Sequence, residues 1–201
     1  MAMDAETDRL IGVATRMFAE LGYDWTSMRL IADAAGVDVE RLTETVGDKP
    51  ELYRQVIVRA HEAERDAMQA VRDSARADVD RALDLADAYL DFYVAHPDYL
   101  ALWLQRWTGD AADTPDLQDL YTRPLFSEIQ RCVQQLTPPD VDSTYLIWTV
   151  VWCVYGFLSG SAQRLASDED RPRHEPPTSE EVESFRAYLH ALIRHMTTPI
   201  G

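Results

Sequence analysis

Residues 26–53 constrain the fold of this 201-residue chain most, because they alternate short apolar helical patterns with well-defined turn residues. Apolar side chains at helical spacing follow Thr26, which is a favourable N-cap residue. Gly36 predicts the left-handed turn that ends this first helix. Asp38 is expected to cap a second short helix that ends at Gly47, before a longer third helix begins. The pattern predicts a helix–turn–helix motif, which is a common way of presenting a helix to the DNA major groove.

Together with residues 9–25, this segment resembles the N-terminal domain of the TetR family of bacterial one-component regulators. The residues that carry the resemblance are Arg9, Ala14, Phe18, Leu21, Gly22, Tyr23, Thr26, Ser27, Ile31, Ala32, Ala35, Gly36, Val37, Leu42, Lys49 and Leu52. The resemblance implies an all-α fold of about nine helices. It also implies a helix–turn–helix domain at residues 1–50 and a ligand-binding and dimerisation domain at residues 51–201.

The resemblance further implies a cytoplasmic, homodimeric transcriptional regulator of the repressor type. Its partners are expected to be a second copy of the chain, operator DNA and a small, largely apolar or aromatic effector, with no membrane partner. Carried over to this sequence, the expected DNA-contacting residues are Thr26, Arg29, Arg41, Thr43 and Lys49.

The charge of the chain keeps a second interpretation open. The net charge is −16, and residues 1–50 contain ten acidic against five basic side chains. On the predicted second helix Glu40 and Glu44 accompany Arg41, and carboxylates repel DNA phosphates. The alternative is a chain that keeps this fold but has lost operator binding, and acts as a small-molecule binder or an enzyme.

The C-terminal part is dominated by an apolar helix predicted over residues 142–166. Residues 143–163 carry no charge, but the Gly, Ser and Thr among them, and flanks without lysine, favour a buried helix over a membrane span. Together with a helix at 179–196, this segment is expected to form the dimer interface. The expected interface residues are Thr149, Cys153, Gly156, Gly160, Phe185, Leu189 and Leu192.

Aromatic residues are dense in the C-terminal helices, and they predict an apolar ligand pocket, although aromatic stripes at helical spacing are often ordinary core. The expected ligand-binding residues are Tyr89, Phe92, Trp103, Trp107, Tyr121, Trp148 and Trp152. The polar half of the long third helix, with Glu62, Glu64 and Asp66, is expected to face solvent.

The sequence contains no recognisable catalytic, cofactor or metal-binding motif. The five histidines lack the spacing of a metal site, and there is no glycine-rich phosphate loop. Cys132 and Cys153 are isolated and predict reduced, packed thiols. No cofactor and no metal are therefore predicted. Enzymatic activity stays open only within the alternative interpretation, because catalytic groups need not form local motifs.

Overall fold

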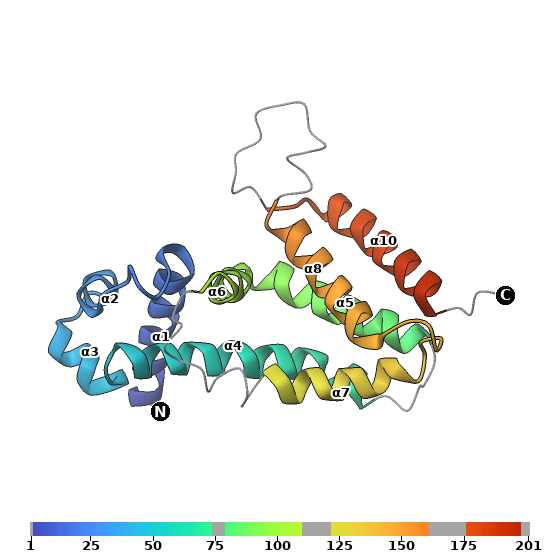
Figure 1. Cartoon of the computed structure of the whole chain (residues 1–201). Coiled ribbons are helices and arrows are strands. Elements are labelled where there is room, and N and C mark those ends of the chain that lie inside the picture. The colour runs from blue at the N-terminus through green and yellow to red at the C-terminus, as the bar shows by residue number, and fades with distance from the viewer. Residues whose placement is uncertain (1, 74–78, 110–121, 161–175, 198–201) are drawn as a thin grey trace. The chain divides into compact units, whose positions relative to one another are not determined.

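The computed structural model describes residues 2–73, 79–109, 122–160 and 176–197, and within these ranges it contains nine α-helices and no strand (Figure 1). The helices are α1 (Ala2–Leu21), α2 (Met28–Ala35), α3 (Val39–Val46), α4 (Lys49–Arg72), α5 (Val79–Ala95), α6 (Pro97–Trp107), α7 (Arg123–Gln134), α8 (Ser143–Leu158) and α10 (Ser179–Thr197). The predicted all-α class is confirmed.

The chain divides into two compact units, and the division falls inside α4 between Ala63 and Glu64. The first unit combines residues 1–63 with residues 96–123, so that it holds α1, α2, α3, the first part of α4, and α6. The second unit holds the end of α4 with α5, α7, α8 and α10. The domain boundary predicted at residue 50 follows the helix–turn–helix motif, whereas the first unit also takes in α6.

An aromatic cluster ties the helices of the first unit together. The rings of Phe18 and Tyr53 are fully buried and meet edge to face, with their centroids 5.1 Å apart. The ring centroid of Tyr23 lies 4.7 Å from that of Tyr53, and the Lys49 ammonium lies over the Tyr23 ring, 4.2 Å from its centroid. Aromatic pairs of this kind add to the free energy gained by burial. The cluster therefore fixes α4 against the end of α1.

The turn before α2 differs from the predicted one by a single residue. Ser27, not Thr26, caps α2, because its hydroxyl accepts a hydrogen bond of 3.2 Å from the backbone N–H of Leu30. The Thr26 side chain is instead buried, 1% exposed, and its hydroxyl donates to the carbonyl of Gly22 at 2.6 Å. The prediction that Thr26 caps this helix is wrong. Thr26 stabilises the preceding turn instead.

The connection from α2 to α3 has the predicted geometry. Gly36 ends α2 in the left-handed conformation with φ of 70°, which glycine adopts without a Cβ clash. The Asp38 carboxylate caps α3 by accepting a hydrogen bond of 2.9 Å from the backbone N–H of Arg41. The two short helices are therefore joined by a tight turn, as a helix–turn–helix motif requires.

Helix α8 is shorter than predicted. It ends at Leu158, and Gly160 follows it in a left-handed turn with φ of 72°, so Gly160 does not continue the helix face as expected. Residues 161–166 of the predicted helix lie outside the described ranges. None of the helices in those ranges combines the length and the hydropathy that crossing a bilayer demands.

The core of the second unit is formed mainly by α5, α8 and α10. Helix α10 begins with a capping box. The backbone N–H of Thr178 donates to the Glu181 carboxylate, and the backbone N–H of Glu181 donates to the Thr178 hydroxyl. Buried side chains from the three helices form one cluster of Leu90, Val154, Phe157, Val182 and Leu189. The apolar face of α10 thus packs within its own subunit.

An ion-pair network on Arg186 connects α10 to α5. The Arg186 side chain is only 17% exposed. Its guanidinium nitrogens lie 3.0 Å from a carboxylate oxygen of Asp87, 2.5 Å from one of Asp91 and 3.2 Å from one of Glu183. These carboxylates raise the pKa of Arg186, although its partial burial opposes the increase. His190 also contacts Asp87, at 2.8 Å.

Replacing Arg186 by Met is expected to lower the free energy of unfolding by about 1–2 kcal/mol. The methionine fills similar volume but leaves three neighbouring carboxylates without their shared cation. Arg186→Lys keeps the positive charge but not the planar guanidinium, so the free energy of unfolding should fall by less than in Arg186→Met. Urea denaturation at pH 7 and low salt measures both losses. Equal stability of Arg186→Met and wild type would contradict a stabilising network.

Candidate functional site

The exposed face of α3 is the candidate DNA-binding surface. Leu42 and Val46 of this helix are buried in the first unit, which directs Glu40, Arg41 and Glu44 to solvent. Arg41 is the only basic residue on α3, and each acidic neighbour opposes contact with phosphate. The helix is therefore oriented for groove reading while its surface charge is negative.

Arg41 is engaged within the subunit. Its guanidinium reaches Glu6 on α1, with Nη2–Oε2 at 2.5 Å and Nε–Oε1 at 3.3 Å. The contact lowers the pKa of Glu6 and raises that of Arg41, in both cases chiefly through the hydrogen bond between them. A bidentate arginine–carboxylate pair has the same geometry as an arginine–phosphate or arginine–guanine contact. A base contact by Arg41 would therefore require that Glu6 be displaced first.

The other predicted contact residues differ in exposure. Arg29 on α2 and Thr43 on α3 are exposed, although the Thr43 hydroxyl already donates to the carbonyl of Val39 at 2.9 Å. Lys49 is half-buried against Tyr23. Burial of Thr26 removes its hydroxyl from solvent, and this argues against the DNA contact predicted for it. Arg29, Arg41 and Lys49 are left as the cations on which phosphate binding would depend.

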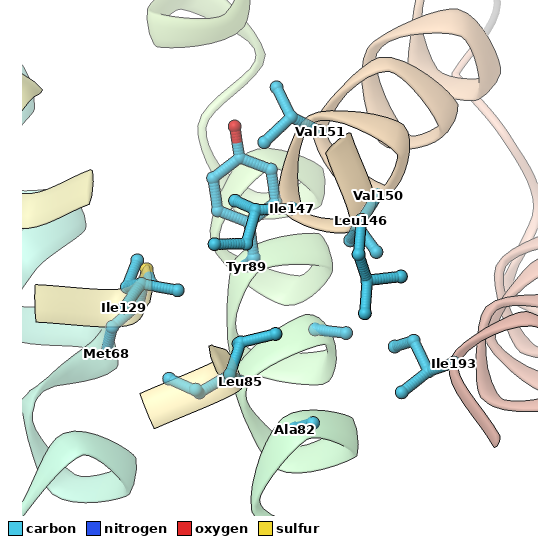
Figure 2. Close-up of a pocket in the computed structure, with 12 residues that line it drawn as sticks. Met68, Ala82, Leu85, Tyr89, Ile129, Leu146, Ile147, Val150, Val151 and Ile193 are labelled. Carbon is cyan, nitrogen blue, oxygen red and sulfur yellow. The ribbon is translucent and has the colours of Figure 1, made fainter. Parts of the chain in front are cut away.

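The second unit contains an apolar cavity of about 80 Å³. Side chains from α4, α5, α7, α8 and α10 line it, among them Met68, Ile129 and Ile193 (Figure 2). Tyr89 on α5 is the one lining residue in the described ranges with a hydrogen-bonding side chain, and in Figure 2 its hydroxyl lies at the end of the ring away from Leu85 and Ala82. The volume exceeds the roughly 10–15 Å³ that one water needs, but walls of this kind favour an apolar occupant.

A buried polar cluster adjoins the Tyr89 side of this cavity. The hydroxyls of Tyr89, Tyr93 and Tyr155 are hydrogen-bonded to one another, and that of Tyr93 also bonds the Glu64 carboxyl. Glu64 is 8% exposed, and its burial raises its pKa to about 7. Burial likewise raises the pKa of all three tyrosines. The expectation that Glu64 faces solvent is wrong.

The spacing of α4 contained a signal for this burial. Ala60, Glu64 and Met68 follow one another at four-residue intervals, and all three are buried on one face of the helix. Glu62 and Asp66, on either side of Glu64, are exposed as predicted. The prediction assigned the whole polar half of α4 to solvent, and it therefore missed that the Glu64 side chain continues the buried face of the helix.

The predicted ligand-binding residues are distributed over both units. Tyr89 lines the cavity, and Phe92 is buried beside Tyr93 on the same helix. Trp148 stacks on Phe126, whereas Trp152 is 56% exposed. Trp103 and Trp107 belong to the first unit, and Tyr121 lies outside the described residues. The ligand contacts of all seven residues stay a prediction, and of these residues Tyr89 lines the cavity.

The predicted interface residues also separate into two groups. Thr149 and Gly156 are half-exposed on α8, in line with the exposed rings of Tyr145 and Trp152 at helical spacing. Tyr188, 54% exposed, extends the apolar surface on α10. We call these five residues the α8–α10 surface.

The remaining predicted interface residues do not belong to the α8–α10 surface. Leu189 is fully buried in the core of its own subunit, so it is not available to a partner chain. Cys153 packs against the same core, and the Phe185 ring stacks on Phe157 with centroids 4.1 Å apart. Leu192 is half-buried on α10. The predicted interface is therefore corrected for Leu189, whereas the interface role of Gly160, half-exposed after the end of α8, stays a prediction.

Comparison with known proteins supports this interpretation of the two units. Residues 10–56 match the family model described as bacterial regulatory proteins, tetR family. The fold is similar to that of the ketosteroid transcriptional regulator KstR2 of Mycobacterium tuberculosis, with a TM-score of 0.70 and 18% identity, covering 96% of this chain and 95% of that chain. It is also similar to the TetR family regulator PfmR from Thermus thermophilus, with a TM-score of 0.64, 20% identity and coverage of 96% and 97%. A search of curated protein sequences finds no match.

The described residues thus combine a unit that contains a helix–turn–helix motif with a second helical unit that contains an apolar cavity. The N-terminal segment of the chain is a tetR-family domain, and the whole chain has the fold of solved TetR-family regulators. The chain is thus TetR-like in its N-terminal segment and in its fold.

Proposed function

We propose that this chain acts in the cytoplasm as a homodimeric repressor, which binds operator DNA through α3 and responds to a small apolar ligand in the second unit. The observation that carries the proposal is the arrangement of α2 and α3, which buries Leu42 and Val46 and turns Arg41 outward. In a two-fold dimer, two such helices read half-sites about one helical turn of DNA apart.

The α8–α10 surface supports dimerisation. Tyr145, Trp152 and Tyr188 are more than half exposed on two helices of one unit, and exposed apolar patches commonly mark protein interfaces. On α8, Thr149 lies between Tyr145 and Trp152, and Gly156 lies one turn beyond Trp152; both small residues permit a close approach of another helix. A second copy of the chain is the occupant that we propose for this surface.

The acidic residues around Arg41 favour one alternative. Asp38, Glu40 and Glu44 surround the single arginine of α3, and such a surface suits a protein that keeps the fold but does not bind an operator. That protein would act as a small-molecule binder or an enzyme. The two functions differ in one property, sequence-specific DNA binding.

Selection of genomic fragments distinguishes them. The full-length chain is incubated with fragmented DNA from its source genome at 0.05 M and at 0.15 M salt, and retained fragments are sequenced. We expect enrichment of fragments with an inverted repeat at the lower salt and its near disappearance at the higher one. Arg41→Ala should abolish the enrichment. Retention of no particular sequence by the wild type at either salt would favour the alternative.

Replacing Glu6 by Gln is expected to strengthen DNA binding. The substitution removes the carboxylate that competes with DNA for Arg41, and an exposed pair of this kind gives a gain of roughly twofold to fivefold in affinity. Fluorescence anisotropy with a selected duplex at 0.05 M salt measures it. Glu62→Gln, with the same charge change on exposed α4 surface, serves as the control and should gain less. Equal gains in both variants would mean that only net charge matters.

A further inference from the structure

Among the described residues that line the cavity of the second unit, Tyr89 alone has a hydrogen-bonding side chain, and we call its hydroxyl the polar end of the cavity. The other lining residues in the described part of the chain are aliphatic or methionine. Among these described residues (Figure 2), the Tyr89 hydroxyl is therefore the group with which a ligand could form a side-chain hydrogen bond. Specificity in a mostly apolar site is normally set by such single polar groups.

Two neighbouring tyrosines, Tyr93 and Tyr155, hold the Tyr89 hydroxyl in place. Its ring centroid lies 4.9 Å from that of Tyr93 and 6.5 Å from that of Tyr155, and the three hydroxyls are hydrogen-bonded to one another. Tyr93 connects this group to the buried carboxyl of Glu64. A fixed hydroxyl loses little freedom when it bonds a ligand, which favours selective binding.

The same surroundings discriminate against charged ligands. Burial disfavours ionisation of Glu64 and of the three tyrosines, so the polar end resists charge. A carboxylate would be desolvated in the cavity, and the described lining residues include no basic side chain that could pair with it. An ammonium would be desolvated among aliphatic side chains, and Glu64 is not among the lining residues that could pair with it.

We propose that the cavity binds an uncharged apolar molecule with one terminal hydrogen-bonding oxygen, such as an alcohol, and that the Tyr89 hydroxyl recognises this oxygen. Tyr93, Tyr155 and Glu64 are positioning residues, which act through Tyr89. This inference rests on the proposed ligand control and specifies the chemical class of the ligand.

The test uses a pair of probes with the same number of heavy atoms, hexan-1-ol and heptane, and the full-length protein without DNA. Binding is measured for wild type and for Tyr89→Phe, which keeps the ring and removes the hydroxyl. The hexan-1-ol affinity should fall roughly fivefold to tenfold in the variant, whereas the heptane affinity should stay equal or rise. Tyr99→Phe, a change in the first unit outside the cavity lining, should alter neither.

Hexanoate and hexylammonium test the exclusion of charge at pH 6.5. Both are expected to bind at least about tenfold more weakly than hexan-1-ol. Tighter binding of either ion, or a ratio of hexan-1-ol to heptane affinity that Tyr89→Phe leaves unchanged, would overturn the inference. A variant that loses both probes equally would show a structural rather than a recognition role, and would overturn it too. Failure of operator binding leaves these ratios untouched, so the two proposals fail separately.

Discussion

Glu64→Gln is expected to raise the free energy of unfolding by about 3 kcal/mol at pH 8 and to change it little at pH 4.5. Burial raises the pKa of this carboxyl from 4.5 to about 7 in the folded protein. As the pH rises from 4.5, the unfolded chain ionises Glu64 while the folded state retains the proton. Folded stability therefore decreases until the folded carboxyl also ionises, near pH 7. Glutamine has nearly the same shape and cannot ionise.

Urea denaturation at pH 4.5, 6 and 8 and at one protein concentration measures the difference between variant and wild type. Glu62→Gln on the exposed side of α4 is the matched control, and its effect should stay within about 0.5 kcal/mol at each pH. A gain for Glu64→Gln of the same size at all three pH values would contradict the account. So would a loss at pH 8.

Gly156→Leu should convert the proposed homodimer into a folded monomer. A Cβ added at Gly156 meets no atom within 4 Å in its own subunit, so the larger side chain has room in the isolated chain. In a two-fold interface the leucine occurs twice, and overpacking costs about 1–3 kcal/mol per site. The dissociation constant should then rise roughly 10²-fold or more. Helix propensity improves at the same time, because glycine is replaced within a helix.

Sedimentation velocity at micromolar concentration, with circular dichroism as the check on folding, tests this expectation. Gly12→Leu is the matched control, since Gly12 also lies in a helix with open space at its Cβ but belongs to the first unit. It should remain a dimer. The idea of an interface at the α8–α10 surface fails if wild type sediments as a monomer, or if Gly156→Leu remains a dimer with unchanged affinity.

Local patterns in the sequence predicted the helices well, because caps, turn glycines and apolar spacing act within a few residues. Gly36 and Asp38 ended and began helices as expected. Thr26 and Ser27 are adjacent residues with equal capping chemistry, so the pattern could not decide which of the two caps α2. Tertiary contact decided it, because Thr26 is buried in the preceding turn.

The candidate sites depend on contacts between distant residues, and these were harder to predict. The apolar face of α10 was recognised, but the sequence does not tell whether such a face packs on its own subunit or on a partner. Leu189 packs internally, whereas Tyr188 beside it is exposed. The pairing of Arg41 with Glu6, 35 residues away, had no local signal.

The dependence of DNA affinity on salt tests the function of α3 most directly. A selected duplex is titrated from 0.05 to 0.15 M salt with wild type and with a variant carrying Glu40→Gly and Glu44→Gln. If Arg29, Arg41 and Lys49 each neutralise a phosphate or contact a base in both subunits, wild-type affinity should fall roughly 10²-fold or more over this range and become undetectable at its end. The variant should bind more tightly throughout. Nanomolar wild-type binding at 0.15 M salt, unchanged by the two substitutions, would place the DNA-reading surface somewhere other than α3.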